Sequence, residues 1–304
     1  MVAHSKPIGV GGRLFRRVLL ILVAASLPLA TPAVGQSPAP QRIVSLVPSV
    51  TEILFAIGAG GQIVGIGSFD TIPDQFQDSH EINRVGGLLD PDMERIFTLR
   101  PDLVILYESQ TDPQEQLRRA GIPVLPYQHG TLAEISETIR DLGQRTEHPV
   151  EANAVATELE AGLAEIRNRV AGRQRPRTLL VFAREPMAMR NVYVSGGIGF
   201  LHDMLDAAGG ENVFAAVQRE RVAQVSSEAI LTSAPDVIIE IRYEDSLSQS
   251  TLDRERAVYG QLSTLPAVRT GRVHFLMGNR FVVPGPGVAE ATAELARLLH
   301  PDAF

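Results

Sequence analysis

Residues that perform covalent or metal chemistry are sparse and badly spaced in this sequence. Cysteine is absent, which excludes disulfides, thiolate metal sites and cysteine nucleophiles. Neither G-x-S-x-G nor H-E-x-x-H occurs. Two Gly-rich turns approach the phosphate-binding pattern G-x-G-x-x-G, but Ile63 and His202 stand where its last glycine belongs. A metal-ion site would have to use His129, His202 or His274, whose spacing does not indicate one. The sequence therefore favours binding over catalysis.

One pair of carboxylates recurs with a fixed spacing. Glu94 lies in "MERIFTLRPDLVIL" and Glu228 lies in "SEAILTSAPDVIIE", and Pro-Asp follows each Glu seven residues later. Each Glu falls in the first turn of a predicted helix, where an acid complements the helix dipole. The recurrence indicates equivalent positions in two similar halves of the chain.

The elements of the first half alternate between strands and helices. After a linker at residues 36–41, residues 42–130 contain apolar runs separated by helical patterns, which predicts a parallel α/β sheet. Ser49 and Glu52 predict a capping box at the first helix. Asp90-Pro91 predicts the start of a later helix with proline at its first position.

The second half, residues 176–304, repeats this order, and "GFLHDMLDAAGG" matches "EILFAIGAGG". Between the halves, residues 131–175 form a helical connection that includes a long helix over residues 149–171. The apolar face of this helix consists of Val155, Leu159, Leu163, Ile166 and Val170. The predicted fold class is α/β, with two similar α/β lobes that contain parallel-type sheets. One long α-helix joins them semi-rigidly, and the ligand cleft lies between the lobes.

The N-terminus predicts export. Residues 1–35 read as a cleaved signal peptide, with Arg13, Arg16 and Arg17 before an apolar run and small residues up to Gly35. An N-terminal anchor and twin-arginine export are the alternatives. The rest of the chain carries 24 basic and 35 acidic side chains, which argues against nucleic acid and anionic lipid as partners. Without a cysteine to carry a lipid, we expect a monomeric periplasmic protein that is not a lipoprotein.

The order of several sequence blocks resembles a known family. "RIVSLVPSVTEILFAIGAGGQIVGI", "VGGLLDPDMERIFTLRPDLVI", "GFLHDMLDAAGGENVF" and "VSSEAILTSAPDVIIE" look like successive blocks of the periplasmic substrate-binding proteins of ABC importers. The similar branch has a single connecting helix and serves cobalamin, ferric siderophores and heme. The resemblance runs from about Arg42 to Leu299.

The resemblance implies a function and a partner. The protein would be the solute-binding subunit of an ABC importer, without an intrinsic cofactor, and its transported ligand would be a corrinoid or a ferric siderophore. Glu94 and Glu228 match the positions that dock onto arginines of the two permease subunits in the inner membrane. Heme or metal-ion binding is the alternative, and an exported two-lobed enzyme is a further one. Heme-binding relatives tend to carry a tyrosine where Gly87 stands.

Ligand residues are expected where parallel strands end. Phe69 matches an aromatic position of cobalamin binders, and Leu88 matches a position that can carry tryptophan, which this sequence lacks. Several arginines facing one cleft would suit an anionic ligand. The candidate ligand residues are Pro48, Phe69, Leu88, Tyr107, Arg184, Tyr193, Arg242, Arg280 and Phe281.

Overall fold

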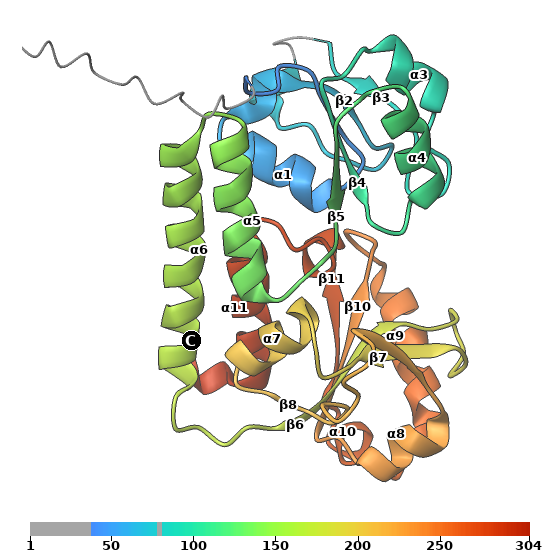
Figure 1. The fold of residues 1–304 in the computed structure, drawn as a ribbon. Helices are drawn as coiled ribbons and strands as arrows, with labels where there is room; N and C mark the ends of the chain where they lie inside the picture. Colours follow the sequence, from blue (N-terminus) through green and yellow to red (C-terminus); the bar gives the residue numbers. More distant parts are fainter. Residues whose placement is uncertain (1–37, 78–80) are drawn as a thin grey trace, which may run out of the picture. The chain divides into compact units, whose positions relative to one another are not determined.

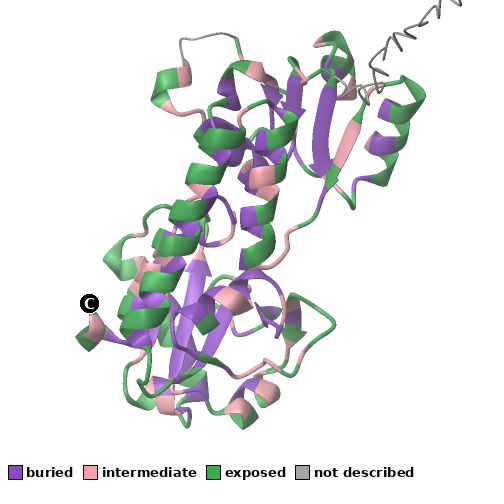
Figure 2. Ribbon diagram, turned by 60° about the vertical axis from the view of Figure 1, so that its left-hand side comes forward, coloured by how far each residue is buried: buried purple, intermediate pink, exposed green. Residues whose placement is uncertain are grey.

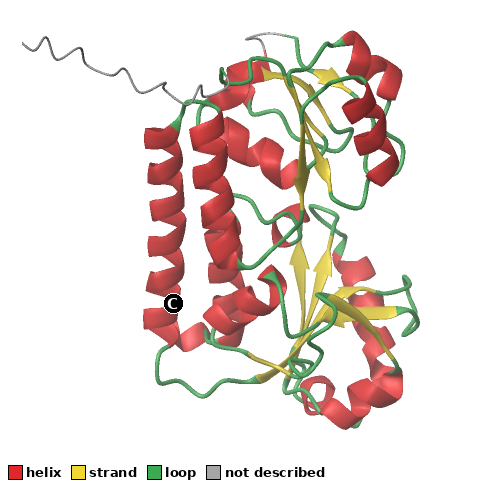
Figure 3. Ribbon diagram, viewed as in Figure 1, coloured by secondary structure: helices red, strands yellow, loops and turns green. Residues whose placement is uncertain are grey.

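Two sheets organise the chain. The computed structural model describes residues 38–77 and 81–304, and Ala39–Phe304 form one compact unit. The first sheet has the order β3-β2-β1-β4-β5, and all of its pairings are parallel (Figure 3). Its strands are β1 (Ile43–Ser45), β2 (Ile63–Ile66), β3 (Asn83–Arg84), β4 (Leu103–Tyr107) and β5 (Val124–Tyr127). The predicted signal peptide lies outside the described residues.

The second sheet is mixed. Its order is β11-β10-β6-β7-β9, with β8 beside β6. The pairings of β10 with β6 and β11 are parallel, whereas β7 runs antiparallel to β6 and β9. Its strands are β6 (Arg177–Ala183), β7 (Val192–Ser195), β8 (Glu211–Asn212), β9 (Val222–Val225), β10 (Val237–Arg242) and β11 (Val273–Met277). The α/β class with two sheets is confirmed, and the two lobes differ at β7 and β9.

Helices cover the sheets and connect them. In the first half they are α1 (Pro48–Ala56), η1 (Ala59–Gln62), α2 (Asp74–Gln77), α3 (Met93–Thr98) and α4 (Thr111–Arg119). The connection contains α5 (Leu132–Arg145) and α6 (Pro149–Val170). The second half contains α7 (Phe200–Ala207), α8 (Ser227–Ser233), α9 (Gln249–Val258), η2 (Tyr259–Leu262), α10 (Pro266–Arg269), η3 (Asn279–Phe281), α11 (Val288–Leu299) and η4 (Pro301–Ala303). In the described part of the chain, no helix has the length and apolar character of a membrane span.

The long helix α6 is confirmed, and it does not stand alone. Its predicted face is buried at Leu159, Leu163, Ile166 and Val170, with Val155 half-buried. Figure 2 shows this pattern as a mostly exposed outer surface on α6. The helix contacts α5, α11, α1 and α7, so that one apolar cluster continues from the first sheet to the second (Figure 1). Burial of this shared cluster stiffens the connection between the two sheets.

The Pro-Asp repeat has a structural explanation. The Asp102 carboxylate accepts hydrogen bonds from the backbone N–H groups of Gln41 and Arg42, just before β1, at 2.7 and 2.8 Å. Asp236 accepts the corresponding bond from Arg177 N–H, at the start of β6, at 3.2 Å. The same arginines donate to the helix ends, Arg42 to Leu99 O and Arg177 to Ser233 O. Each Pro-Asp therefore fastens a helix end to the first strand of its sheet.

Two predicted helix starts are wrong. Helix α1 begins at Pro48 itself, and no side chain caps it, so Ser49 and Glu52 do not form a capping box. Helix α3 begins at Met93, where Asp92 Oδ1 accepts the Arg95 N–H at 2.9 Å. Pro91 lies outside that helix, in a bridge to Gly86. Proline suits the first helical position and occupies it in α1, whereas the Asp92 side-chain cap makes α3 begin after Pro91.

Candidate functional site

Aromatic and imidazole side chains gather at the carboxyl-terminal edge of the first sheet. Tyr107 ends β4 and Tyr127 ends β5, and because these neighbouring strands are parallel, both rings reach the same edge. His129 follows two residues later. Its Nε2 lies 3.3 Å from Tyr107 Oη and its Nδ1 lies 3.3 Å from Tyr127 Oη. The His129 ring also meets Phe200 of α7 edge-on, with the centroids 5.9 Å apart.

A pocket of about 390 Å³ opens over this edge. The second half of the chain contributes Arg221, which stands just before β9. The residues that line the pocket are Tyr107, Glu108, Ser109, Tyr127, Gln128, His129 and Arg221. Of the nine predicted ligand residues, only Tyr107 lines this pocket. Tyr127 occupies the same strand-end position as Tyr107 and could have been found by that rule, whereas no sequence pattern marks Arg221.

The aromatic edge is uncharged at neutral pH. Burial raises the pKa of Tyr107 to about 12, and the neighbouring Tyr127 and Asp70 add to that rise. Burial also lowers the pKa of His129 to about 4, and the charge of Arg221 lowers it further. The pocket floor therefore offers neutral hydrogen-bonding groups.

Other predicted residues of the first half follow neighbouring strands. Phe69, after β2, is 85% exposed, and Leu88, after β3, is 47% exposed. Gln110 holds the Leu88 loop by donating to its carbonyl at 3.0 Å. Pro48, after β1, is half-buried at the first position of α1. These side chains lie at ends of adjacent parallel strands, and their role in ligand binding stays a prediction.

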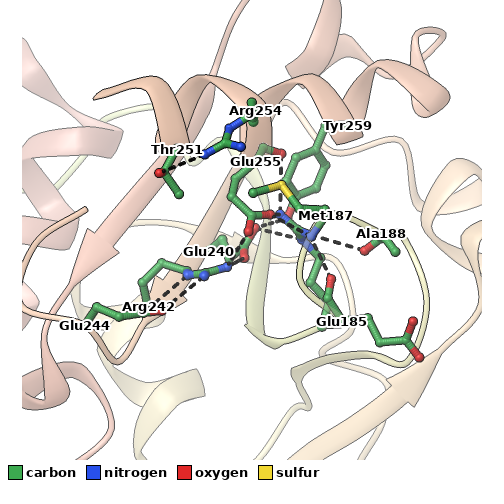
Figure 4. A network of polar contacts seen from close by, with 11 residues as sticks. Glu185, Met187, Ala188, Glu240, Arg242, Glu244, Thr251, Arg254, Glu255 and Tyr259 are labelled. Carbon is green, nitrogen blue, oxygen red and sulfur yellow. Dashed lines mark hydrogen bonds and ion pairs between the residues drawn. The ribbon is translucent and has the colours of Figure 1, made fainter. Parts of the chain in front are cut away.

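Arg184 is wrongly predicted as a ligand residue. Its side chain is 0% exposed and lies between two buried acids, with Nε 3.0 Å from Glu240 Oε2 and Nη2 2.7 Å from Glu255 Oε2. Tyr259 Oη also donates to Glu240 Oε2, at 2.8 Å. Figure 4 shows the two glutamates, Tyr259 and Arg242 converging on one point. We call Arg184, Glu240, Arg242, Glu255 and Tyr259 the buried ion cluster. Its charges neutralise one another inside the protein, as buried charges must.

Of the other four predicted ligand residues in the second half, two are paired with acids, one is buried in the core and one is exposed. Arg242, 12% exposed, is held by Glu240 and Glu244. Arg280 pairs with Glu294 at 2.7 Å. Phe281 is 1% exposed and belongs to the shared apolar core, so its prediction as a ligand residue is wrong. Tyr193 is exposed on β7. Because β7 runs antiparallel to β6, the rule that ligand residues lie where parallel strands end does not apply to it. The sequence could not reveal which arginines find buried acids.

Two carboxyl groups lie close together at α1, the buried Asp70 and the half-buried Glu52. Asp70 accepts a short hydrogen bond from Thr51 Oγ1, and its other oxygen, Oδ1, has no hydrogen-bond partner. Burial raises the pKa of Glu52 to about 7, and the nearby Asp70 charge contributes. A Cβ placed on Gly285, in the loop before α11, would lie 2.5 Å from Glu52 Oε2. The Glu52 carboxyl group therefore lies close to the backbone of the second half at Gly285.

The two repeated glutamates are exposed, and other residues cap their helices. Asp92 caps α3, and Ser226 Oγ accepts from Ala229 N–H at 3.1 Å to cap α8. Glu94 and Glu228 stand in the first turns of these helices. The capping hydrogen bonds thus do not need either glutamate, which leaves their carboxylates available at the surface.

The histidines of the metal-ion alternative have separate surroundings. Both nitrogens of His129 contact tyrosine hydroxyls, and His202 Nδ1 lies 3.3 Å from Asn212 Nδ2. His274 Nε2 is buried without a hydrogen-bond partner. Within residues 38–77 and 81–304, no three or more histidine or acidic side chains are grouped to hold a metal ion.

Comparison with known proteins identifies the family. The family model of the periplasmic binding proteins matches residues 43–279. The chain is 28% identical over 270 residues to the ABC transporter substrate-binding lipoprotein YvrC of Bacillus subtilis, covering 87% of this chain and 82% of that one. It is 28% identical over 253 residues to the vitamin B12-binding protein of Yersinia pseudotuberculosis, covering 83% and 82%. The apo structure of the periplasmic heme-binding protein RhuT of Roseiflexus superposes with a TM-score of 0.69 at 25% identity, covering 87% and 99%.

One expectation is overturned by these relatives. The B. subtilis relative is named a lipoprotein, so the prediction of a protein that is not a lipoprotein is wrong. The family consists of transport proteins rather than enzymes, and its members pair with permease and ATPase components. The chain belongs to the periplasmic binding proteins and is the substrate-binding component of an ABC transporter.

Proposed function

We propose that the protein binds a corrinoid or a ferric siderophore in the pocket over the edge of the first sheet and delivers it to a permease. The observation that carries this proposal is the grouping of Tyr107, Tyr127 and His129 at the ends of β4 and β5, below a pocket of about 390 Å³. Neutral aromatic groups with hydroxyl and imidazole tips suit a large ligand that has apolar faces and a polar periphery. The similarity to vitamin B12-binding proteins supports the corrinoid.

Ultraviolet–visible titration of the purified protein tests this function. Cyanocobalamin, a ferric catecholate, a ferric hydroxamate and hemin would be titrated in parallel. We expect a corrinoid or a ferric siderophore to bind with a Kd below about 10 μM, or about −6.8 kcal/mol. Tyr127→Ala should weaken that binding at least tenfold, whereas Glu151→Ala, a change at an exposed residue of α6 that does not line the pocket, should not. Failure of all four compounds to bind would refute the proposal, and selective binding of hemin would replace the ligand class.

The proposal includes docking through Glu94 and Glu228. Both carboxylates are exposed, occupy equivalent helices, and are not used as helix caps. Two equivalent acids suit a partner that presents two equivalent arginine sites, because charge-assisted bonds orient the encounter.

A transport assay with a matched control tests the docking. The double change Glu94→Ala/Glu228→Ala should abolish ligand uptake while ligand affinity and the unfolding midpoint stay unchanged. Glu151 and Glu290 occupy the first turns of α6 and α11 and are also exposed. Their double alanine variant controls for loss of helix-dipole interactions. Equal uptake by the two double variants would contradict docking through the repeated glutamates.

A further inference from the structure

Arg221 is the arginine that remains available at the pocket. Arg184, Arg242 and Arg280 are each bonded to glutamates. In the part of the chain that the structure describes, no hydrogen bond or ion pair engages the Arg221 guanidinium. Its charge nonetheless acts on His129 across the pocket. An unpaired guanidinium at a pocket wall favours an oxygen anion as its partner.

The fold holds the Arg221 side chain in place. The backbone carbonyl of Arg221 accepts the Gly196 N–H at 2.8 Å. The aliphatic part of the side chain lies over Gly199, where an added Cβ would come within 3.0 Å of Arg221 Cγ. Gly199 has a φ of 85° at the start of α7, so the close approach and the backbone both require glycine there. A positioned stem reduces the side-chain entropy that ligand binding must remove.

A series of neighbouring hydroxyl and imidazole groups leads from the protein interior to the same pocket. The Ser49 hydroxyl is fully buried and makes no hydrogen bond of standard geometry. Burial raises the pKa of Tyr127, and the Ser49 hydroxyl beside it opposes that rise. The Ser49 hydroxyl therefore lies beside the Tyr127 hydroxyl. Tyr127 and Tyr107 in turn contact opposite nitrogens of His129, each at 3.3 Å.

This series of hydroxyl and imidazole groups can donate its protons in one direction, from Ser49 towards Tyr107. If Ser49 donates to Tyr127, the Tyr127 proton goes to His129 Nδ1, because a neutral imidazole has one acceptor nitrogen. His129 then carries its proton on Nε2 and donates it to Tyr107 Oη. The Tyr107 proton is left for the pocket. This assignment of protons depends on the donation from Ser49. Tyr107 O–H and the Arg221 guanidinium are then two donors that line one pocket.

We propose that Tyr107 and Arg221 form a subsite for an oxyanion of the ligand, and this inference rests on the proposed function. The oxyanion can be the phosphodiester of a cobalamin, a carboxylate or a catecholate oxygen, which share this chemistry. Among the described residues no carboxylate forms an ion pair with Arg221, although the Arg221 charge contributes to lowering the pKa of Glu134. Glu134 already accepts from Thr131 N–H and Oγ1 at 2.6 and 2.8 Å, and Glu108 is exposed where it lines the pocket. Glu108 opposes an anion, so Glu108→Gln should tighten its binding.

Matched ligand pairs test the subsite. Each pair differs in its anion: cyanocobalamin and dicyanocobinamide, hemin and its dimethyl ester, a ferric catecholate and a ferric hydroxamate. We expect the cognate compound that carries the anionic group to bind the unmodified protein about tenfold or more tightly than its partner without that group, here called the neutral partner, which is the scale of one charge-assisted bond. The pair that shows the preference identifies the source of the oxyanion.

Variants then assign the preference to residues. Arg221→Gln and Tyr107→Phe should each lose most of it while affinity for the neutral partner is kept, and Arg221→Lys should restore part of it. Ser49→Ala should cause a smaller loss, because it acts only through the direction of the series. Arg219→Gln is the control, since Arg219 is exposed nearby and does not line the pocket. Preference for the neutral partner, or an unchanged preference in Arg221→Gln, would overturn the subsite while leaving the transport function standing. Failure of every compound to bind would instead contradict the proposed function.

Discussion

The carboxyl-terminal edges of the two sheets use polar groups in opposite ways. At the first edge, Tyr107, Tyr127 and His129 are neutral and line a pocket. At the second edge, Arg184 and Arg242 follow or end their strands, yet Glu240 and Glu255 neutralise them from within. The charges at the second edge are therefore paired inside the protein, whereas the first edge leaves hydrogen-bonding groups facing a pocket.

The difference shows how a protein can keep strong charges near a binding region without offering them to a ligand. A buried arginine between two carboxylates stays ionised and fixes the positions of β6, β10 and α9. The neutral edge costs less to bury, because hydroxyl and imidazole groups require single hydrogen bonds rather than counter-charges. The first sheet is thus suited to recognition and the second to support.

The largest expected effect is the loss of one charge from the buried ion cluster. Arg184→Met should lower the free energy of unfolding by about 3–5 kcal/mol, because it leaves the two buried acids Glu240 and Glu255 with Arg242 as their one remaining positive charge in the cluster. Tyr107→Phe at the other edge should cost about 1 kcal/mol. Urea denaturation at pH 7 measures both. Similar losses in the two variants would remove the distinction between a supporting edge and a recognition edge.

The Glu52 carboxyl group in the first half should make the stability of the protein depend on pH. The pKa of Glu52 is about 7 in the folded protein against 4.5 ordinarily, so the folded state holds the extra proton between these values. Stability from Glu52 is therefore complete below about pH 4.5 and is lost as the pH rises through 7. Glu52→Gln removes this loss and should stabilise the protein by about 2 kcal/mol at pH 8, with little change at pH 4.5.

Glu240→Gln provides the contrast, because Glu240 is paired with Arg184, Arg242 and Tyr259. We expect that change to destabilise the protein at pH 8. Denaturation midpoints of both variants at pH 4.5, 6 and 8 measure the effect. Destabilisation by Glu52→Gln at pH 8 would mean that its carboxylate is stabilised in the folded state, contrary to its unpaired contact with Gly285.

The sequence predicted the repeating architecture better than the chemistry of its edges. Apolar periodicity located α6, and the Pro-Asp repeat marked equivalent helix–strand joints, since local spacing determines both. The strand-end rule selected Tyr107, which lines the pocket, but also Arg184, whose buried acids Glu240 and Glu255 are distant in sequence. Side-chain pairing of that kind depends on tertiary packing, which a single sequence does not display.

A smaller effect should come from the helix caps of the repeated stretches, and it should be equal in the two halves. Asp92→Ala and Ser226→Ala each remove one side-chain acceptor from an orphan backbone N–H, and each should cost about 1 kcal/mol. Thermal unfolding followed by circular dichroism measures the two losses. A loss of stability in only one of the two variants would show that the two helix caps do not contribute equally to the stability of the protein.

The smallest expected effect on stability belongs to the two repeated glutamates. Glu94→Gln and Glu228→Gln each keep the shape of an exposed side chain and remove only its interaction with the helix dipole, about 0.5 kcal/mol or less. Because Asp92 and Ser226 already supply the caps, neither change should disturb its helix, and added salt should erase the remaining difference. Denaturation at low and high ionic strength measures it. A salt-independent loss above 1 kcal/mol in either variant would mean that the glutamate supports the fold, and its repetition would then need no membrane partner to explain it.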